Sequence, residues 1–200
     1  MKILSSSISD YIDINYNIDE FNSIDELSNI YELTLNAYDY SMSVAPFYPN
    51  ELTYFKSLKH CTFMNFEINE EILISLNKLD NLKELVFDNC TGSINYIFNN
   101  KLESLTLENS SVSLINIGNK KTIKKMLILE SETIDIENII LYENLESLKI
   151  LNCNIDNSSM LRLLKPNCKI ELIGCVLDNK DVLNELNNVI YNPEQYNKID

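Results

Sequence analysis

The clearest pattern of apolar and polar positions lies in residues 145–155, which read Leu-Glu-Ser-Leu-Lys-Ile-Leu-Asn-Cys-Asn-Ile. Four apolar residues and one cysteine stand at defined intervals within it, at Leu145, Leu148, Ile150, Cys153 and Ile155. Leu148 and Ile150 flank Lys149, so two side chains point inward and the one between them points outward, as in a short β-strand. The segment therefore predicts one strand followed by a turn.

The same spacing recurs along the chain when the Cys153 position is taken as an anchor. Most anchors have apolar residues three, five and eight places before them, and the anchors are Asn17, Tyr38, Phe66, Cys90, Ser110, Ser131, Cys153 and Cys175. They are separated by 21, 28, 24, 20, 21, 22 and 22 residues, which is a nearly constant period. One such coil cannot close a core alone, so the repeat predicts stacked coils whose short strands form a parallel sheet.

Residues 145–155 match the pattern L-x-x-L-x-L-x-x-N/C-x-L and the other copies follow it imperfectly, so the chain resembles the leucine-rich repeat family over about residues 10–178. The resemblance implies an α/β solenoid with a parallel sheet on its concave face. Short helices, 3₁₀ turns and loops would form the convex face, and ligands would bind the concave one. The family carries Asn or Cys at the anchor, bonded to the adjacent turn; the residues that depart from this are Tyr38, Phe66, Ser110 and Ser131.

The chain is predicted to form a single domain over residues 1–200. Residues 1–29 would hold an N-terminal cap with a first atypical repeat, and residues 30–178 the remaining repeats. A C-terminal capping helix is predicted at 179–190, behind Asp178 or Asn179 as N-cap, and a tail at 191–200. The apolar face of that helix would consist of Val182, Leu183, Leu186, Val189 and Ile190.

The composition of two connections between strands predicts their structure. Residues 69–79 have the composition of a short helix with acidic residues in its first turn. Residues 41–50 contain Pro46 and Pro49 around two aromatic residues, which predicts an irregular loop.

Composition narrows the class of partner. The formal net charge of −14 and pI near 4.4 argue against nucleic acid or an anionic membrane surface, which proteins bind through Lys and Arg. Residues 1–10 lack the continuous apolar stretch of a signal peptide, and no window approaches the roughly 20 apolar residues of a membrane span. Five cysteines without a C-x-x-C pair favour reduced thiols. We therefore expect a cytoplasmic protein.

Few residues suggest chemistry. His60 and Cys61 are adjacent, but neighbouring strand residues point to opposite faces, so His60 cannot act as the base of a cysteine nucleophile. No Cys or His cluster has the spacing of a zinc site, and three glycines do not form a phosphate-binding loop. The expected protein is not an enzyme and has no cofactor. A basic patch lies in a turn or contacts an acidic partner, and it consists of Lys120, Lys121, Lys124 and Lys125.

The outward residues of the strands are more informative. Between the two inward residues the repeats carry Asp13, Thr34, Thr62, Val86, Thr106, Leu127, Lys149 and Glu171. Two places later they carry Asn15, Asn36, Met64, Asp88, Glu108, Leu129, Leu151 and Ile173. The predicted partner-binding residues on the concave face are Leu127, Leu129, Lys149, Leu151 and Ile173. Two alternatives are that the C-terminal helix or tail covers the apolar residues, or that the register of the Met126 copy is shifted by one.

These observations predict a non-catalytic module that binds a protein partner through the concave sheet face. The partner would be another protein of unknown identity or a second copy of the chain, with no nucleic acid and no membrane. The alternatives are a substrate-recognition or regulatory subunit of an enzyme complex, and a structural repeat protein without a dedicated ligand.

Overall fold

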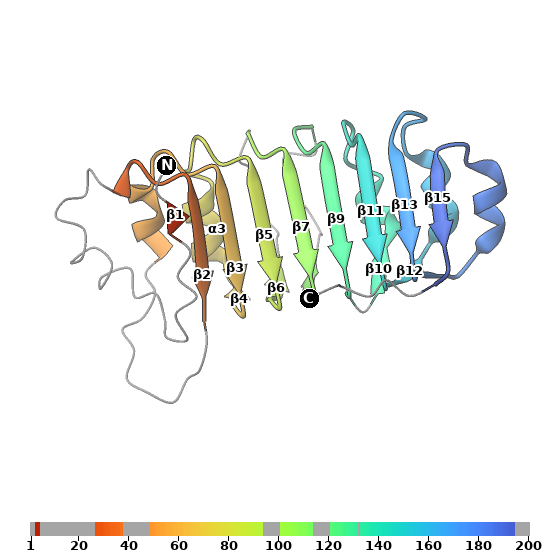
Figure 1. Cartoon of the computed structure of the whole chain (residues 1–200), viewed down its shortest axis with the longest axis horizontal. Coiled ribbons are helices and arrows are strands. Elements are labelled where there is room, and N and C mark those ends of the chain that lie inside the picture. Colours follow the sequence, from red (N-terminus) through yellow and green to blue (C-terminus); the bar gives the residue numbers. More distant parts are fainter. Residues whose placement is uncertain are drawn as a thin grey trace.

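The computed structural model describes residues 3–4, 27–37, 49–93, 101–113, 121–131 and 133–194. Its main feature is one long sheet in which every strand runs parallel to its neighbours (Figure 1). The strands, in their order across the sheet, are β1 (Ile3–Leu4), β2 (Glu32–Asn36), β3 (His60–Met64), β5 (Glu84–Asp88), β7 (Ser104–Glu108), β9 (Lys125–Leu129), β11 (Ser147–Leu151), β13 (Lys169–Ile173) and β15 (Val189–Asn192). Sequence order and spatial order coincide, as expected for a solenoid.

The core lies behind this sheet and consists of the inward residues predicted from the repeat. From β2 to β13, the second and fourth residues of each strand are at most 2% exposed. Phe63 and Phe87, on neighbouring strands, stack with ring centroids 5.8 Å apart. Burying one such side chain contributes about 1.5–3 kcal/mol, so the repeated column of apolar residues is the main source of stability.

Most strands end in a residue with a left-handed backbone. Asn65, Asn89, Asn109, Glu130 and Asn152 have φ between 45° and 63°, and Gly174 has φ 65°. Asparagine tolerates this conformation better than most residues because its short amide bonds locally. The sharp turn redirects the chain away from the sheet after each strand.

A ladder of asparagine side chains links the first of these turns. Asn65 donates from Nδ2 to Asn36 Oδ1 at 2.8 Å, Asn89 to Asn65 at 2.5 Å, and Asn109 to Asn89 at 3.3 Å. The turn residue that follows in the array is Glu130, whose side chain has no amide N–H to donate. The ladder thus covers the repeats of β2 to β7.

The anchor residues bond to the backbone as the family resemblance implies. Cys90 Sγ donates to Phe63 O at 3.3 Å, and Cys175 Sγ donates to Ile150 O at 3.2 Å. Ser110 Oγ donates to Phe87 O at 3.1 Å and accepts from Cys90 N at 2.9 Å. Serine can therefore replace cysteine at the anchor. Within the described residues, Ser131 Oγ is buried and has no hydrogen-bond partner.

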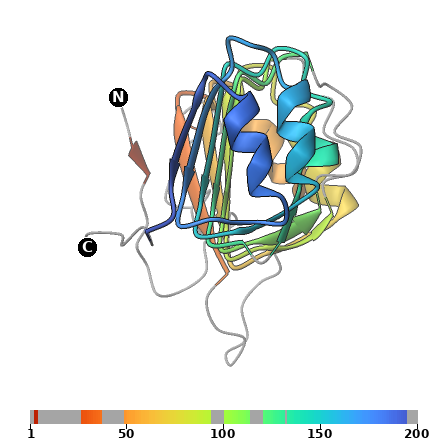
Figure 2. The same cartoon turned by 90° about the vertical axis from the view of Figure 1, so that its right-hand side faces the viewer.

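The return path of each coil is built from short elements. The helical ones are η1 (Pro49–Tyr54), α3 (Glu70–Leu76), α4 (Ile136–Ile139), η2 (Ser158–Leu163) and η3 (Lys180–Glu185). The predicted helix within residues 69–79 is confirmed: Asn69 caps α3 by accepting from Ile72 N at 3.0 Å, ahead of Glu70 and Glu71. In Figure 2 the helical segments lie on one side of the main sheet.

Two small parallel sheets also line the return path. The first contains β4 (Glu67–Ile68), β6 (Thr91–Ser93) and β8 (Ser111–Ser113). The second contains β10 (Thr133–Asp135), β12 (Asn154–Asp156) and β14 (Val176–Leu177). Within the described residues no pairing joins β8 to β10, so this back sheet is divided between the repeats of β7 and β9.

The predicted capping helix at 179–190 is wrong beyond residue 185. Asn179 does act as the N-cap, accepting from Asp181 N at 3.0 Å, but η3 ends at Glu185. Leu186 is extended, and Val189–Asn192 forms β15, which pairs with β13. The residues from 189 to 192 therefore add a strand to the sheet instead of a lid, and the tail starts later than 191.

At the other end, the neighbour of β2 is β1, where Ile3 pairs with Glu32 and Leu4 with Leu33. The predicted copy at Asn17, the Tyr38 anchor and most of the loop at 41–50 lie outside the described residues. Pro49 and Asn50 open η1.

Candidate functional site

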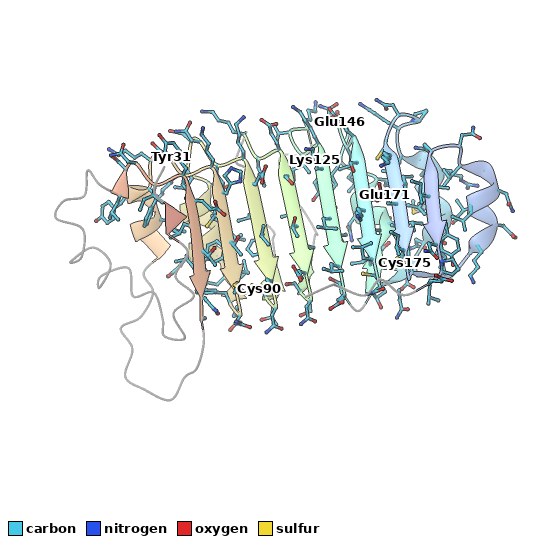
Figure 3. All side chains as sticks on the ribbon, in the orientation of Figure 1. Tyr31, Cys90, Lys125, Glu146, Glu171 and Cys175 are labelled. Carbon is cyan, nitrogen blue, oxygen red and sulfur yellow. The ribbon has the colours of Figure 1, made fainter. Side chains whose placement is uncertain are left out.

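The open face of the main sheet is the face predicted to be concave. It carries the first, third and fifth residues of each strand, because successive side chains point to opposite sides. No described helix lies over it in Figure 2, and Figure 3 shows Lys125 and Glu171 on its strands. Backbone pairing from β2 to β13 keeps the same register throughout, so these residues form three straight columns.

The first column changes charge along the sheet. It contains Glu32, His60, Glu84, Ser104, Lys125, Ser147 and Lys169. His60 Nδ1 lies 2.9 Å from Glu84 Oε2, so the acidic end also holds a hydrogen-bonded pair. Lysines replace carboxylates from β9 onward.

The second and third columns confirm the predicted order of outward residues from Thr34 and Asn36 onward; Asp13 and Asn15 lie outside the described residues. The second column is Thr34, Thr62, Val86, Thr106, Leu127, Lys149, Glu171 and Ile190. The third is Asn36, Met64, Asp88, Glu108, Leu129, Leu151, Ile173 and Asn192. Met126 pairs with Leu105 and Leu148, which excludes the register shift considered above.

The five predicted binding residues are brought together on three adjacent strands, but their exposure differs. Leu127, Lys149 and Ile173 are partly exposed. Leu129 is only 5% exposed and Leu151 only 3%, and neither belongs to the contiguous core behind the sheet. The expectation of a fully exposed apolar patch is therefore wrong for these two leucines. The C-terminal helical segment η3 lies on the opposite side of the sheet and does not cover them (Figure 2).

A charged cluster borders this apolar group. Glu171 Oε1 lies 2.6 Å from Lys169 Nζ, and Glu171 Oε2 lies 3.5 Å from Lys149 Nζ. The hydrogen bond from Lys169, with the positive charge of both lysines, holds the pKa of Glu171 below its ordinary value. The lysines thus favour the ionised carboxylate, which stands on the same strand as Ile173 and is separated from Leu127 by Lys149.

A second charged row lies at the edge where the strands begin. Glu103 lies between two lysines, 3.1 Å from Lys83 Nζ and 3.4 Å from Lys124 Nζ. These contacts, led by the hydrogen bond from Lys83, lower the pKa of Glu103. Of the predicted basic patch, Lys124 is therefore paired, Lys121 lies 3.8 Å from Glu143, and Lys125 belongs to the open face. Lys120 lies outside the described residues.

The cysteines have the properties of core residues. Cys61 is 1% exposed, burial raises its pKa, and its neighbour His60 points to the open face. Burial likewise raises the pKa of Cys153 and of Cys168 to about 11, which leaves both as neutral thiols at pH 7. Among the described residues, no group of three or more His, Cys, Asp or Glu side chains could hold a metal ion.

Two shallow cavities lie away from the open face and share Leu145 and Lys165. Their volumes are about 230 and 260 Å³, and each is lined by one carboxylate, Glu143 and Glu146 respectively. Neither lining includes a histidine or cysteine. The open face remains the candidate functional site.

Sequence reasoning missed the first column and Ile190. The first column was recoverable, because each of its residues stands two places before an outward residue that had been identified. Ile190 was missed because residues 179–190 were assigned to a helix. The observed face is therefore wider by one column and longer by one strand than predicted.

Comparisons with known proteins bear on the fold. No family model matches the sequence, and no curated protein matches it. A solved structure of internalin C2 from Listeria monocytogenes is similar, with a TM-score of 0.50 and 17% sequence identity. The similarity covers 84% of this chain and 82% of that one.

The chain has a leucine-rich-repeat-like fold. The long parallel sheet, the short helices of the return path and the similarity to internalin C2 agree on an α/β solenoid. Within the described part of the chain, no helix has the length and apolar character needed to cross a membrane.

Proposed function

We propose that this chain is a non-catalytic interaction module that binds a protein partner through the open face of its sheet. The observation that supports it most is the change in the outward columns at β9. Threonine and acidic residues give way to Leu127, Lys149 and Ile173, although the inward residues keep the same pattern. The fold does not require this change, so recognition is the better explanation.

The geometry of the sheet suits recognition. Paired parallel strands hold the outward side chains in place before binding, so little conformational entropy is lost on association. Leu127 and Ile173 supply apolar anchors, and the ion-paired Lys149 and Glu171 follow Leu127 in the second column. Protein interfaces commonly combine apolar anchors with charged groups.

The test uses the full chain and a variant of the accessible apolar residues, Leu127→Glu with Ile173→Glu. Leu129 and Leu151 are left intact because their burial makes a change in folding hard to separate from a change in binding. Affinity purification from the native host cell, followed by mass spectrometry, should identify a protein that the wild type retains. The double variant should lose it, with affinity reduced about tenfold or more, since central interface residues contribute most of the binding energy.

The matched control is Leu163→Glu, because Leu163 lies in η2 behind the sheet and is 58% exposed. It should keep the partner, and circular dichroism should show all variants folded. If the double variant retained the same partner, the open face would not be the binding site. If the retained partner is an enzyme, the chain is its recognition or regulatory subunit; if no partner is found, the chain is a structural repeat protein.

A further inference from the structure

The C-terminal end of the solenoid leaves apolar side chains only partly covered. Val189 and Tyr191 are the inward residues of β15, yet both are partly exposed, whereas Ile170 and Leu172 on β13 are 0% exposed. Leu183 and Leu186 pack against the core from the same end and are also partly exposed. Repeat arrays need a polar cap at each end, and within the described residues no polar element covers β15.

The backbone of β15 is also available. Ile170 N donates to Asn188 O at 3.0 Å, and Gly174 N donates to Asn192 O at 2.7 Å. Main-chain groups alternate in direction along a strand, so the groups of Val189 and Tyr191 point away from β13. Within the described residues no strand pairs with this outer edge. Residues 189–192 contain neither lysine nor proline, the residues that commonly block exposed edges.

The side chain of Ile190 marks the centre of this edge. It stands on the open face between the two outward-bonding residues and is 52% exposed. A two-fold axis beside Ile190 would place Val189 opposite Tyr191 of a second copy, and Tyr191 opposite Val189. Residues that exchange backbone hydrogen bonds in an antiparallel pair stand directly opposite each other, so the edge is complementary to itself.

We infer that β15 is a dimerisation edge, at which two copies of this chain join their sheets end to end in antiparallel fashion. The two Ile190 residues would form a non-hydrogen-bonded pair with Cα atoms about 4.5 Å apart. On the core side, the partly exposed Val189, Tyr191, Leu183 and Leu186 would meet their counterparts. The contact would thus pair the free backbone groups of β15 and also bury the partly exposed apolar side chains at this end of the array.

The charge of the chain predicts an unusual salt dependence. Two copies with a net charge of −14 each repel one another, whereas the proposed contact is made by backbone and apolar groups. Salt screens the repulsion, with a Debye length of about 8 Å at physiological ionic strength. Dimerisation should therefore strengthen as salt is added, opposite to an interface held by ion pairs.

The decisive experiment measures the mass of the full chain by sedimentation velocity over a range of concentrations. The wild type should reach twice the 23.1 kDa of one chain. Ile190→Lys and Ile190→Glu should each raise the dimer dissociation constant about a hundredfold, because like charges would stand directly opposite. An equimolar mixture of the two variants should dimerise again, since lysine then faces glutamate.

Two controls fix the location. Val176→Lys alters a residue that is 61% exposed on β14, a back-sheet strand that pairs with β12 and not with β15, and it should leave dimerisation unchanged. Ile190→Cys should form a disulfide-linked dimer on mild oxidation, whereas Val176→Cys should not; the five native cysteines are buried and give little background. A wild type that stays monomeric at its solubility limit would overturn the proposal. So would a dimer that survives Ile190→Lys, or an edge that instead captures a strand of another protein.

Discussion

Strands β2 to β7 and strands β9 to β13 bury their second and fourth residues equally, yet their outward residues differ. The first group presents threonine, asparagine and carboxylates, with an asparagine ladder along its turns. The second presents leucine, isoleucine and lysine, and its turns include Glu130 and Gly174. The stacked core tolerates either set. Differences between the two groups therefore report on requirements other than folding.

The largest expected difference in stability between the two groups of strands lies at the anchor position, where each group has a buried serine. Ser110 Oγ accepts from Cys90 N and has both Phe87 O and Glu108 O within reach of its one hydrogen, whereas Ser131 Oγ has no hydrogen-bond partner among the described residues. Ser110→Ala should lower the free energy of unfolding by about 1–3 kcal/mol, because it leaves buried backbone groups unpaired. Ser131→Ala should change it by about 0.5 kcal/mol or less. Urea unfolding followed by circular dichroism measures both, and equal losses would contradict the contrast.

A smaller effect is expected at the turns. Glu130 has φ 53° and Asn109 has φ 45°, a region that costs most residues about 1–2 kcal/mol and asparagine less. Glu130→Asn should raise the free energy of unfolding by about 0.5–1 kcal/mol. Asn109→Glu should lower it by about 1 kcal/mol, because it also removes the bond to Asn89. Matched urea titrations test the pair, and a destabilising Glu130→Asn would show that backbone conformation does not limit this turn.

The smallest effect concerns the ion pairs beside the apolar residues. The pKa of Glu171 is below its ordinary value of 4.5 because Lys169 and Lys149 stabilise the carboxylate. A lowered carboxyl pKa stabilises the folded state above the ordinary value, and this contribution disappears as pH falls through the folded-state pKa. Glu171→Gln should therefore be slightly less stable than wild type at pH 7, and the difference should shrink as the pH falls below 4.5. If the difference in stability between Glu171→Gln and wild type grew as the pH fell, the stabilising role of these ion pairs would be contradicted.

The repeat and its register were predictable because alternation along a strand has a period of two residues. Once Leu148 and Ile150 were placed inward, Lys149 and Leu151 had to point outward, and the structure places them so. A tandem array multiplies this signal, since each strand must match its neighbours. The low exposure of Leu129 and Leu151 was not predictable in this way, because alternation fixes the face on which a side chain stands and not how closely its neighbours pack around it.

The C-terminal end shows a different limit. Val182, Leu186, Val189 and Ile190 fit a helical spacing, but Val189 and Tyr191 also fit the alternation of a strand. Local pattern cannot decide between them. The neighbouring strand β13 decides between helix and strand. When residues 189–192 pair with β13 as a strand, they satisfy a row of its backbone groups that a helix would leave to solvent.

Within the described residues, the back sheet is interrupted between the repeats of β7 and β9. At this junction the main sheet pairs over all five residues of each strand, while the described part of the back sheet does not cross it. The interruption coincides with the place where threonine and carboxylate give way to leucine and lysine on the open face. The two outer surfaces of the array therefore change at the same repeat, while the inward column passes through it unchanged.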